Sequence, residues 1–366
     1  MNIEHFLTLA NPSWMQSESD SDIVISTRIR LARNIANVRF PISFTEQDAE
    51  QIDNQLMNAL LTVDNENPYR FSYFSIKDLP QLQRQILMEK HLISPNLARR
   101  KKIGSFFLTE NESISILVKE EDHIRIQSLA QGMDLQRAYD QAKTVDRYLS
   151  KSIAFAYEER YGYLTSCPTN VGTGLRASVM LHLPALTLTK QMNALIQMIT
   201  RLGMVVRGIY GEGSDNLGNV YQISNQITLG KSEQEILQEL EKVVEQIIQK
   251  EQLARKNLLL RAPSVLEDRL SRSLGTLKYA KILPSEEAAS CLSNVRLGVS
   301  LGLLEPISQR KLNECMLIMQ PGLIQQYAGT TLQPTERDMY RAKLLQEKLQ
   351  EQASNDGEKG EGSYDV

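Results

Sequence analysis

Hydrophobic and polar residues alternate with two different periods along this chain. Between residues 23 and 230, short apolar or alternating runs separated by turn residues predict strands at 23–28, 104–108, 113–118, 178–183, 204–207 and 220–224. Helical spacing predicts helices at 46–61 and 190–201. The glycine-rich residues 211–218 between the last two strands indicate a hairpin in an antiparallel sheet. This first part is therefore expected to be an α+β domain.

The second part has only helical periodicity. Apolar residues recur every three or four positions from about residue 236. From residue 263 to residue 349 we expect only helices, with breaks or starts at Pro284, Pro306, Pro321 and Pro334. The predicted organisation is a short leader over 1–20, an α+β domain over 21–254, an all-α C-terminal domain over 255–352 and a disordered polar tail over 353–366.

Composition narrows the class of protein. A length of 366 residues suggests two domains, and a net charge of −3 argues against direct nucleic-acid binding. The three cysteines, Cys167, Cys291 and Cys315, lie far apart without metal-like spacing, which suggests a reducing compartment. Because no signal peptide and no long apolar stretch is visible, we expect a cytoplasmic protein without membrane contact.

The most distinctive candidate for chemistry is the segment Cys-Pro-Thr-Asn-Val-Gly-Thr-Gly-Leu-Arg at residues 167–176. Asn170, Gly172 and Gly174 allow a tight turn and a close approach to a ligand. Arg176 adds a permanent planar cation suited to phosphate oxygens. Because no Gly-Lys-Ser/Thr follows, this is not a Walker loop. The segment predicts an anion-handling loop that leads into a strand.

Three further clusters combine arginine with acidic groups or with other arginines. Arg28 and Arg30 would share one face of a strand and repel each other unless an anion lies between them; the alternative is a solvated basic edge. Residues 120–125 (Glu-Glu-Asp-His-Ile-Arg) and 207–212 (Arg-Gly-Ile-Tyr-Gly-Glu) each place an acid near an arginine at a strand end. The alternative for each is a surface ion pair of little value.

Residues 337–341 (Arg-Asp-Met-Tyr-Arg) form a fourth cluster, in a predicted helix. Arg337 and Arg341 share a face with Asp338. The alternatives are a capping box of Thr335 and Asp338, or simple pairing of the arginines with neighbouring acids. Two histidines are expected to be structural: His91 at a helix end and His182 packed within a strand.

Together, the clusters at 26–30, 120–125, 167–176 and 207–212 resemble the phosphagen (guanidino) kinase family over residues 21–254. The family signature reads Cys-Pro-Thr/Ser-Asn-Leu/Val-Gly-Thr-Gly-Leu-Arg, and the other clusters match its motifs in order. The resemblance implies an antiparallel-sheet catalytic domain flanked by helices. It also implies transfer of the γ-phosphoryl group of ATP to a guanidino nitrogen.

The resemblance implies roles for individual residues. Glu121 and Glu212 would grip the acceptor guanidinium, one of them acting as base, and Cys167 would lie beside it; His91 would lie near the adenine. The nucleotide-binding positions would be Ser26, Thr27, Arg28, Ile29, Arg30, His91, Arg125, Arg176, Ala177, Ser178, Val179, Met180, Arg207, Gly208, Ile209, Tyr210 and Gly211. Mg²⁺ would be held mainly by the nucleotide, so we expect no protein metal site.

Two departures from the small-molecule kinases of this family point to a larger acceptor. Those kinases have a helical domain of about a hundred residues before the first arginine motif, which helps to enclose the substrate. Here Arg28 comes almost at once, and a helical domain follows residue 255 instead. Both features resemble bacterial protein-arginine kinases of the McsB type. In that group the motif Arg-Asp-x-x-Arg-Ala resembles an allosteric phosphoarginine pocket, here Arg337, Asp338, Arg341 and Ala342.

That resemblance implies an ATP-dependent kinase of protein arginine residues that marks proteins for regulated proteolysis in the stress response. The implied partners are arginine-bearing substrates including a heat-shock repressor, an activator protein, the ClpC–ClpP protease and a second copy in a homodimer. One alternative is a kinase of free arginine or another small guanidino compound. Another is a non-catalytic adaptor that binds phosphoarginine.

Overall fold

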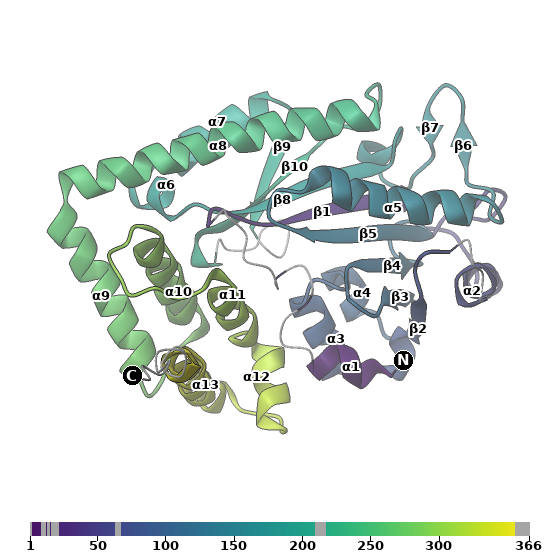
Figure 1. Cartoon of the computed structure of the whole chain (residues 1–366). Helices are drawn as coiled ribbons and strands as arrows, with labels where there is room; N and C mark the ends of the chain where they lie inside the picture. Colours follow the sequence, from purple (N-terminus) through teal and green to yellow (C-terminus); the bar gives the residue numbers. More distant parts are fainter. Residues whose placement is uncertain are drawn as a thin grey trace, which may run out of the picture.

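The computed structural model describes residues 2–8, 12, 15, 22–62, 67–208 and 217–355, with side chains as far as residue 350. Its centre is an eight-stranded sheet in which every neighbouring pair is antiparallel, in the order β2-β3-β4-β5-β1-β8-β10-β9 (Figure 1). These strands are β1 Val24–Arg33, β2 Phe71–Ser75, β3 Ser105–Thr109, β4 Ile114–Val118, β5 Ile124–Gln131, β8 Leu175–His182, β9 Met204–Gly208 and β10 Val220–Asn225. The predicted α+β domain with an antiparallel sheet is confirmed.

Two strands that carry predicted motifs have different ends from those predicted. β1 extends to Arg33 and β8 already begins at Leu175, so Arg176 belongs to a strand rather than to the preceding loop. β2 and β5 were not predicted. β5 begins with the alternation Ile-Arg-Ile-Gln at residues 124–127, but Leu129 and Ala130 are adjacent apolar residues, so the period of two is lost halfway along the strand. β9 and β10 are adjacent antiparallel strands, as expected of a hairpin; residues 209–216 lie outside the described part.

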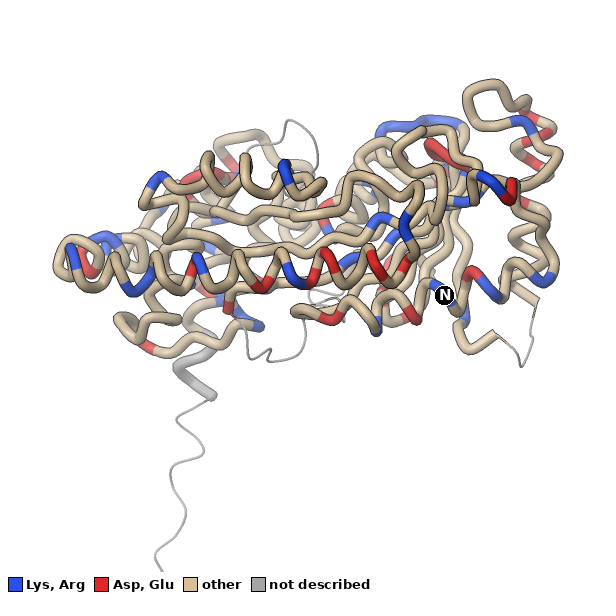
Figure 2. The backbone as a smooth tube through the Cα atoms, turned by 90° about the horizontal axis from the view of Figure 1, so that it is seen from above, with Lys and Arg blue, Asp and Glu red and all other residues tan. Residues whose placement is uncertain are grey.

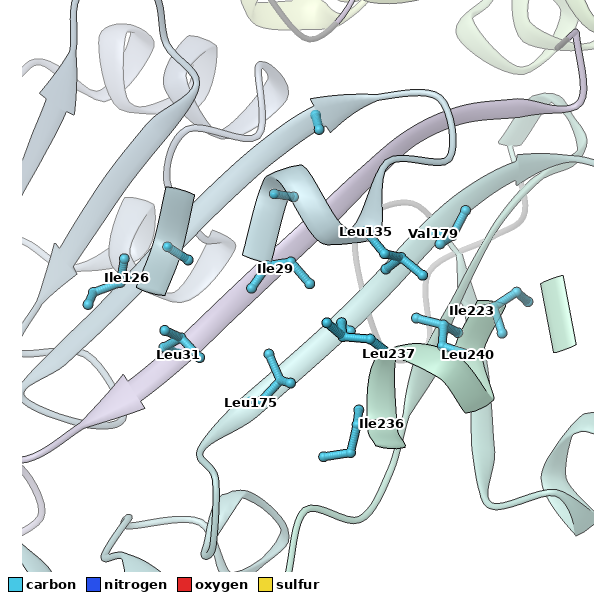
Figure 3. Packing of buried hydrophobic residues seen from close by; sticks show 14 of the residues in the cluster. Ile29, Leu31, Ile126, Leu135, Leu175, Val179, Ile223, Ile236, Leu237 and Leu240 are labelled. Carbon is cyan, nitrogen blue, oxygen red and sulfur yellow. The ribbon is translucent and has the colours of Figure 1, made fainter. Parts of the chain in front are cut away.

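One face of the sheet is apolar and covered by helices α5 (Leu135–Ser150) and α8 (Glu233–Arg261). Figure 3 shows Ile29, Leu31, Val179 and Ile223 of the sheet facing side chains of these helices, including Leu237. Figure 2 looks down on the helices from outside and shows acidic and basic residues alternating along them. The helices are therefore amphipathic, and burial of their apolar stripes holds them to the sheet.

The opposite face is divided. Across β3, β4 and β5 it is apolar, with Phe106, Leu108, Leu117 and Leu129 packed in a second core. That core is completed by α1 Ile3–Thr8, α3 Gln81–Glu89 and α4 Pro95–Arg99, below the sheet in Figure 1. Helix α2, Glu46–Leu61, begins with a capping box in which Thr45 and Asp48 satisfy each other's backbone amides. Over β1, β8, β9 and β10 the same face carries arginines and Gln222, with a small apolar cluster of Ile25, Met180 and Val220 at one end.

The C-terminal part is helical, as predicted. Its helices are α9 Pro263–Tyr279, α10 Ser285–Ser300, α11 Gln309–Ile318, α12 Pro321–Ala328 and α13 Pro334–Asn355, and the shorter α6 Pro184–Leu188 and α7 Met192–Arg201 lie in the first part. Pro321 occupies the first turn of α12, and Pro284 is the N-cap of α10. The predicted boundary at 255 falls within α8, and residues 353–355 of the predicted disordered tail are helical.

Buried polar contacts join the two parts. The Glu89 carboxylate at the end of α3 accepts hydrogen bonds from the backbone amides of Gly322 (2.8 Å) and Leu323 (3.0 Å) and so caps α12. His182 of β8 is fully buried, as predicted, and its Nε2 lies 2.8 Å from Ser293 Oγ of α10. Within the described residues, no helix combines the length and the apolar character needed to cross a bilayer.

Candidate active site

Five arginines from four strands gather on the polar half of the sheet. Arg28 and Arg30 come from β1, Arg125 from β5, Arg176 from β8 and Arg207 from β9, and all five line one cavity of about 420 Å³. The strand register explains the convergence. Arg30 lies opposite Arg176 across β1 and β8, and alternate residues of each strand face the same side. Side chains separated by up to 179 positions in the sequence thus meet at one place.

The electrostatics of the cavity favour an anion. Burial, followed by the neighbouring Arg176 and Arg125 cations, lowers the pKa of Arg28 to about 10. Burial and the Arg28, Arg125 and Arg176 guanidiniums also lower the pKa of Arg30. Arg28 Nη2 donates to Gln222 Oε1 at 2.6 Å, whereas the buried Nε of Arg30 has no hydrogen-bond partner. Clustered guanidiniums with an unsatisfied donor are suited to bind phosphate oxygens, which supply both charge and acceptors.

Two adjacent carboxylates stand at the edge of the cavity with different exposure. Glu120 is buried, and its carboxylate accepts from Arg125 Nη1 at 3.0 Å and from Ser94 Oγ. The Glu121 side chain is 45% exposed and accepts from Arg125 Nη2 at 2.9 Å. Glu120 therefore holds Arg125 in place, while Glu121 remains accessible to a molecule that enters from solvent.

The Cys-Pro-Thr-Asn segment forms one rim of the cavity, through Asn170 and Gly174. Gly174 has φ 64°, and a Cβ there would lie 2.6 Å from the carbonyl oxygen of Ala32, so a larger residue would separate the loop from β1. Cys167, at the N-terminus of the 3₁₀ turn Pro168–Asn170, is partly buried with Sγ 3.1 Å from Thr169 Oγ1. Cys167 is not among the residues that line the cavity.

Beyond Arg28 the cavity meets a small hollow lined by Ser26, His91, Ser178 and Met180. His91 follows Lys90, the C-cap of α3, and has φ 60°, a left-handed conformation; it lines both spaces. Burial and the Arg28 cation lower the pKa of His91 to about 3, so the ring is neutral at physiological pH. A neutral ring beside cations is suited to contact an uncharged part of a ligand.

Several predicted nucleotide-binding side chains do not face the cavity. Ile29, Ala177 and Val179 lie in the core on the opposite face, because they alternate with the cavity residues, so only their backbone is available to a ligand. Thr27 is buried and its hydroxyl donates to Gly132 O at 2.7 Å. Gly208 is the last residue of β9. Ile209, Tyr210, Gly211 and Glu212 lie outside the described residues.

Glu120, Arg99 and Gln222 are among the cavity residues to which the sequence assigned no role. Glu120 directly precedes Glu121, to which the sequence assigned a role. The burial of Glu120 and its hydrogen bond from Ser94 could not be predicted from the sequence. Gln222 lies between the core residues Tyr221 and Ile223 of β10, so the alternation of the strand places it on the cavity face. Arg99 comes from α4, and only the packing of that helix brings it to the sheet.

The predicted cluster at residues 337–342, in α13, contains both buried and accessible residues. Arg341 is buried and donates to the carbonyl oxygens of Met319 (2.9 Å) and Leu283 (2.8 Å) and to Asp338 (2.5 Å), whereas Ala342 lies in the helical core. Arg337 is half-buried and donates to Leu332 O at 2.9 Å. The predicted capping box is wrong: the amide that is capped belongs to Gln333, and Glu336 is its acceptor at 2.7 Å.

An arginine cavity on an antiparallel sheet, with an accessible carboxylate at its edge, is suited to phosphoryl transfer. The chain matches the family described as ATP:guanido phosphotransferase, C-terminal catalytic domain, over residues 51–254. It therefore belongs to the ATP:guanido phosphotransferases, which are phosphotransferases with a guanidino group as acceptor. A solved structure of lombricine kinase is similar, with a TM-score of 0.56, 26% identity, and coverage of 67% of this chain and 70% of that chain.

More similar relatives narrow the position within the family. Residues 263–360 match the description Protein-arginine kinase McsB C-terminal domain. A protein-arginine kinase of Geobacillus sp. (strain WCH70) is 50% identical over 350 residues, covering 95% of this chain and 97% of that protein. That of Bacillus subtilis (strain 168) is 48% identical over 350 residues, covering 95% and 96%. Within the guanido phosphotransferases, the chain belongs to the protein-arginine kinase family.

Proposed function

We propose that this protein transfers the γ-phosphoryl group of ATP to the guanidino groups of arginine side chains in other proteins. The observation that carries the proposal is the convergence of five arginines on a cavity whose edge presents the half-exposed carboxylate of Glu121. Membership of the protein-arginine kinase family supports this choice of nucleotide and acceptor.

The cavity residues would bind and orient the nucleotide. The guanidiniums of Arg28, Arg30 and Arg176 would neutralise the phosphates and hold the γ-phosphoryl group for in-line attack. In the described part of the chain, no three His, Cys, Asp or Glu residues are grouped so as to hold a metal ion. The arginine cavity fits a Mg²⁺ ion that arrives bound to the nucleotide phosphates. That ion would offset negative charge during the transfer.

Glu121 would act on the acceptor. A guanidinium is a poor nucleophile because it stays protonated, so the reaction needs a carboxylate to orient it and to take one proton. The proton moves to Glu121 as the N–P bond forms; the bond between the γ-phosphorus and the β-phosphate oxygen breaks and ADP leaves. Glu120 would keep Arg125 aligned with the phosphates. The part predicted for Glu212 and Cys167 in gripping the same group remains a proposal.

The acceptor class is tested by incubating the protein with Mg-ATP and either casein or free arginine, with detection of acid-labile phosphoarginine. We expect phosphoarginine on casein. Phosphorylation of free arginine alone would replace the proposal with a small-molecule kinase, and transfer to neither would favour a phosphoarginine-binding adaptor.

The role of Glu121 is tested with Glu121→Gln, which preserves the side-chain shape but removes the base. We expect kcat to fall by about 10²–10⁴-fold, with ADP affinity within a few-fold of wild type. The matched control is Glu239→Gln, because Glu239 is 44% exposed and pairs with Lys231 far from the cavity. An unchanged kcat in Glu121→Gln would refute the assigned base.

We further propose that the modification marks proteins for regulated proteolysis by ClpC–ClpP in the cytoplasmic stress response. The proposed partners are a heat-shock repressor as substrate, an activator protein and a second copy of the chain. We also propose that the cluster around Arg337 and Asp338 binds phosphoarginine and regulates the enzyme. Sedimentation velocity tests the dimer, and binding of a phosphoarginine peptide to wild type and Arg337→Ala tests the regulatory pocket.

A further inference from the structure

A groove opens beside the arginine cavity, between helices α3 and α4, which lie below the sheet in Figure 1. Its volume is about 300 Å³. Met88 and Arg99 line both the groove and the cavity, so the two spaces adjoin. The α3–α4 groove is completed by Gln81, Arg84, Gln85, Ala98 and Lys101.

The groove follows one face of α3. Gln81, Gln85 and Met88 recur at intervals of three or four residues, so they lie along one side of the helix. Seven helical residues rise about 10 Å, which is the length of about three residues of an extended polypeptide. Because Met88 also lines the cavity, a chain whose arginine enters the cavity could lay its next residues along α3.

Hydrogen bonds hold the α4 wall of the groove against the acceptor end of the cavity. Arg100, the C-cap of α4, donates through Nη2 to the carbonyl oxygen of Glu120 at 2.9 Å. Glu120 directly precedes Glu121 in the turn at the edge of the cavity. Arg84 Nη1 donates to the carbonyl oxygen of Ala98 at 3.1 Å and so joins α3 to α4. The groove is therefore fixed beside the carboxylate to which the acceptor is assigned.

The charged side chains of the groove are all positive. They are Arg84, Arg99 and Lys101, and among the described residues no acidic side chain lines the groove. Arg99 and Lys101 are exposed, so an incoming carboxylate can reach them. The Nε of Arg84 is buried without a hydrogen-bond partner. Charge complementarity therefore favours an acidic polypeptide segment in this groove.

We infer that the α3–α4 groove binds the residues next to the acceptor arginine and selects segments that contain Asp or Glu. This inference rests on the proposed function and specifies its substrates. Carboxylates would pair with Arg99 and Lys101, and the amides of Gln81 and Gln85 are suited to hydrogen-bond a peptide backbone. Since the groove lies beside the reacting atoms and not among them, the selection should appear in KM more than in kcat.

The test uses peptides with a single arginine, in which the second and third positions on both sides are either Asp or Asn. Phosphorylation by the full chain with Mg-ATP gives kcat and KM for each peptide. Lys101→Glu reverses a charge in the groove. The matched control is Lys102→Glu, because Lys102 is the next residue, is also exposed and does not line the groove. The two variants therefore have the same net charge.

We expect wild type and Lys102→Glu to phosphorylate the Asp peptide with a kcat/KM about fivefold above that of the Asn peptide, from two solvated ion pairs. In Lys101→Glu the ratio should fall to about one or below, and added salt should lower it in wild type. An unchanged kcat for the Asn peptide shows that each variant is folded.

Equal kcat/KM for the two peptides in wild type would overturn the inference. So would a preference that survives Lys101→Glu, or one that both lysine variants lose equally. If peptide turnover is too slow to measure, the same ratios are obtained from inhibition of casein phosphorylation by the two peptides. Wild-type protein that phosphorylated neither casein nor any peptide would instead contradict the proposed function.

Discussion

Arginines in the sheet and arginines in the helical part are buried in opposite ways. Arg28 and Arg30 in the cavity have other cations as their main charged neighbours, and this repulsion, added to burial, lowers their pKa. Arg341 in α13 is more deeply buried, yet two backbone carbonyl groups and Asp338 surround it. The positive charge of arginine is thus only partly compensated by its neighbours in the cavity, whereas it is fully compensated in α13.

The cavity arginines are therefore expected to serve ligand binding, and the buried arginine of α13 is expected to serve stability. A cation cluster raises the energy of the folded state until an anion arrives, so such residues are expected to serve a ligand. A guanidinium that spans three acceptors from different segments holds those segments together, and its loss leaves buried acceptors unsatisfied. Substitutions in the two regions should therefore affect different measurements.

The largest effect is expected in the cavity. Arg30→Ala should lower kcat/KM for protein phosphorylation by about 10³-fold, because one donor and one charge at the transferring phosphate are lost. The free energy of unfolding should stay the same or rise, because one repelling cation is removed from the cluster. Steady-state kinetics and urea denaturation measure the two quantities. A large loss of stability in Arg30→Ala would break the comparison.

The next effect is expected in the helical part. Arg341→Ala should lower the free energy of unfolding by about 3 kcal/mol, because the carbonyls of Leu283 and Met319 and the Asp338 carboxylate lose their partner. The matched control is Arg337→Ala on the same helix, where a single bond to Leu332 is lost and a cost of about 1 kcal/mol is expected. Equal stability of the two variants would show that Arg341 is not the structural arginine that its contacts indicate.

The smallest effect is expected at Glu89, which joins the two regions. Burial raises the pKa of Glu89 to about 7 from an ordinary value of 4.5. The folded state therefore binds the proton more tightly than the unfolded state, and stability should fall as pH rises between these values. We expect a loss of about 2 kcal/mol between pH 5 and pH 7.

Glu89→Gln keeps an acceptor for Gly322 and Leu323 but cannot ionise, so its stability should be flatter over this range. Denaturation of both proteins at several pH values checks the difference. If both proteins show the same pH dependence, another group is responsible, and Glu89 does not sense pH at the junction of the two parts.

Motif residues in strands could be predicted from the sequence because alternation is a local property. A period of two places Arg28 and Arg30 on the same face and Ile29 on the other, whatever the rest of the molecule does. Helical spacing likewise indicated the C-terminal helices, and prolines indicated several of their starts. The long strand β5 escaped prediction because its period of two is lost halfway, where Leu129 and Ala130 are adjacent apolar residues.

The sequence by itself determined the helices of the C-terminal part, the strands that carry Arg28, Arg30 and Arg207, the arginines of the site and the family to which the chain is similar. Only the tertiary structure decided which partners those arginines have. Arg28 donates to Gln222 of β10, Arg341 is enclosed by the carbonyl groups of Leu283 and Met319, and α10 and α11 lie against the sheet beside Met180. The physical reason is that side-chain neutralisation and burial depend on contacts between residues far apart in the chain, and no local pattern records them.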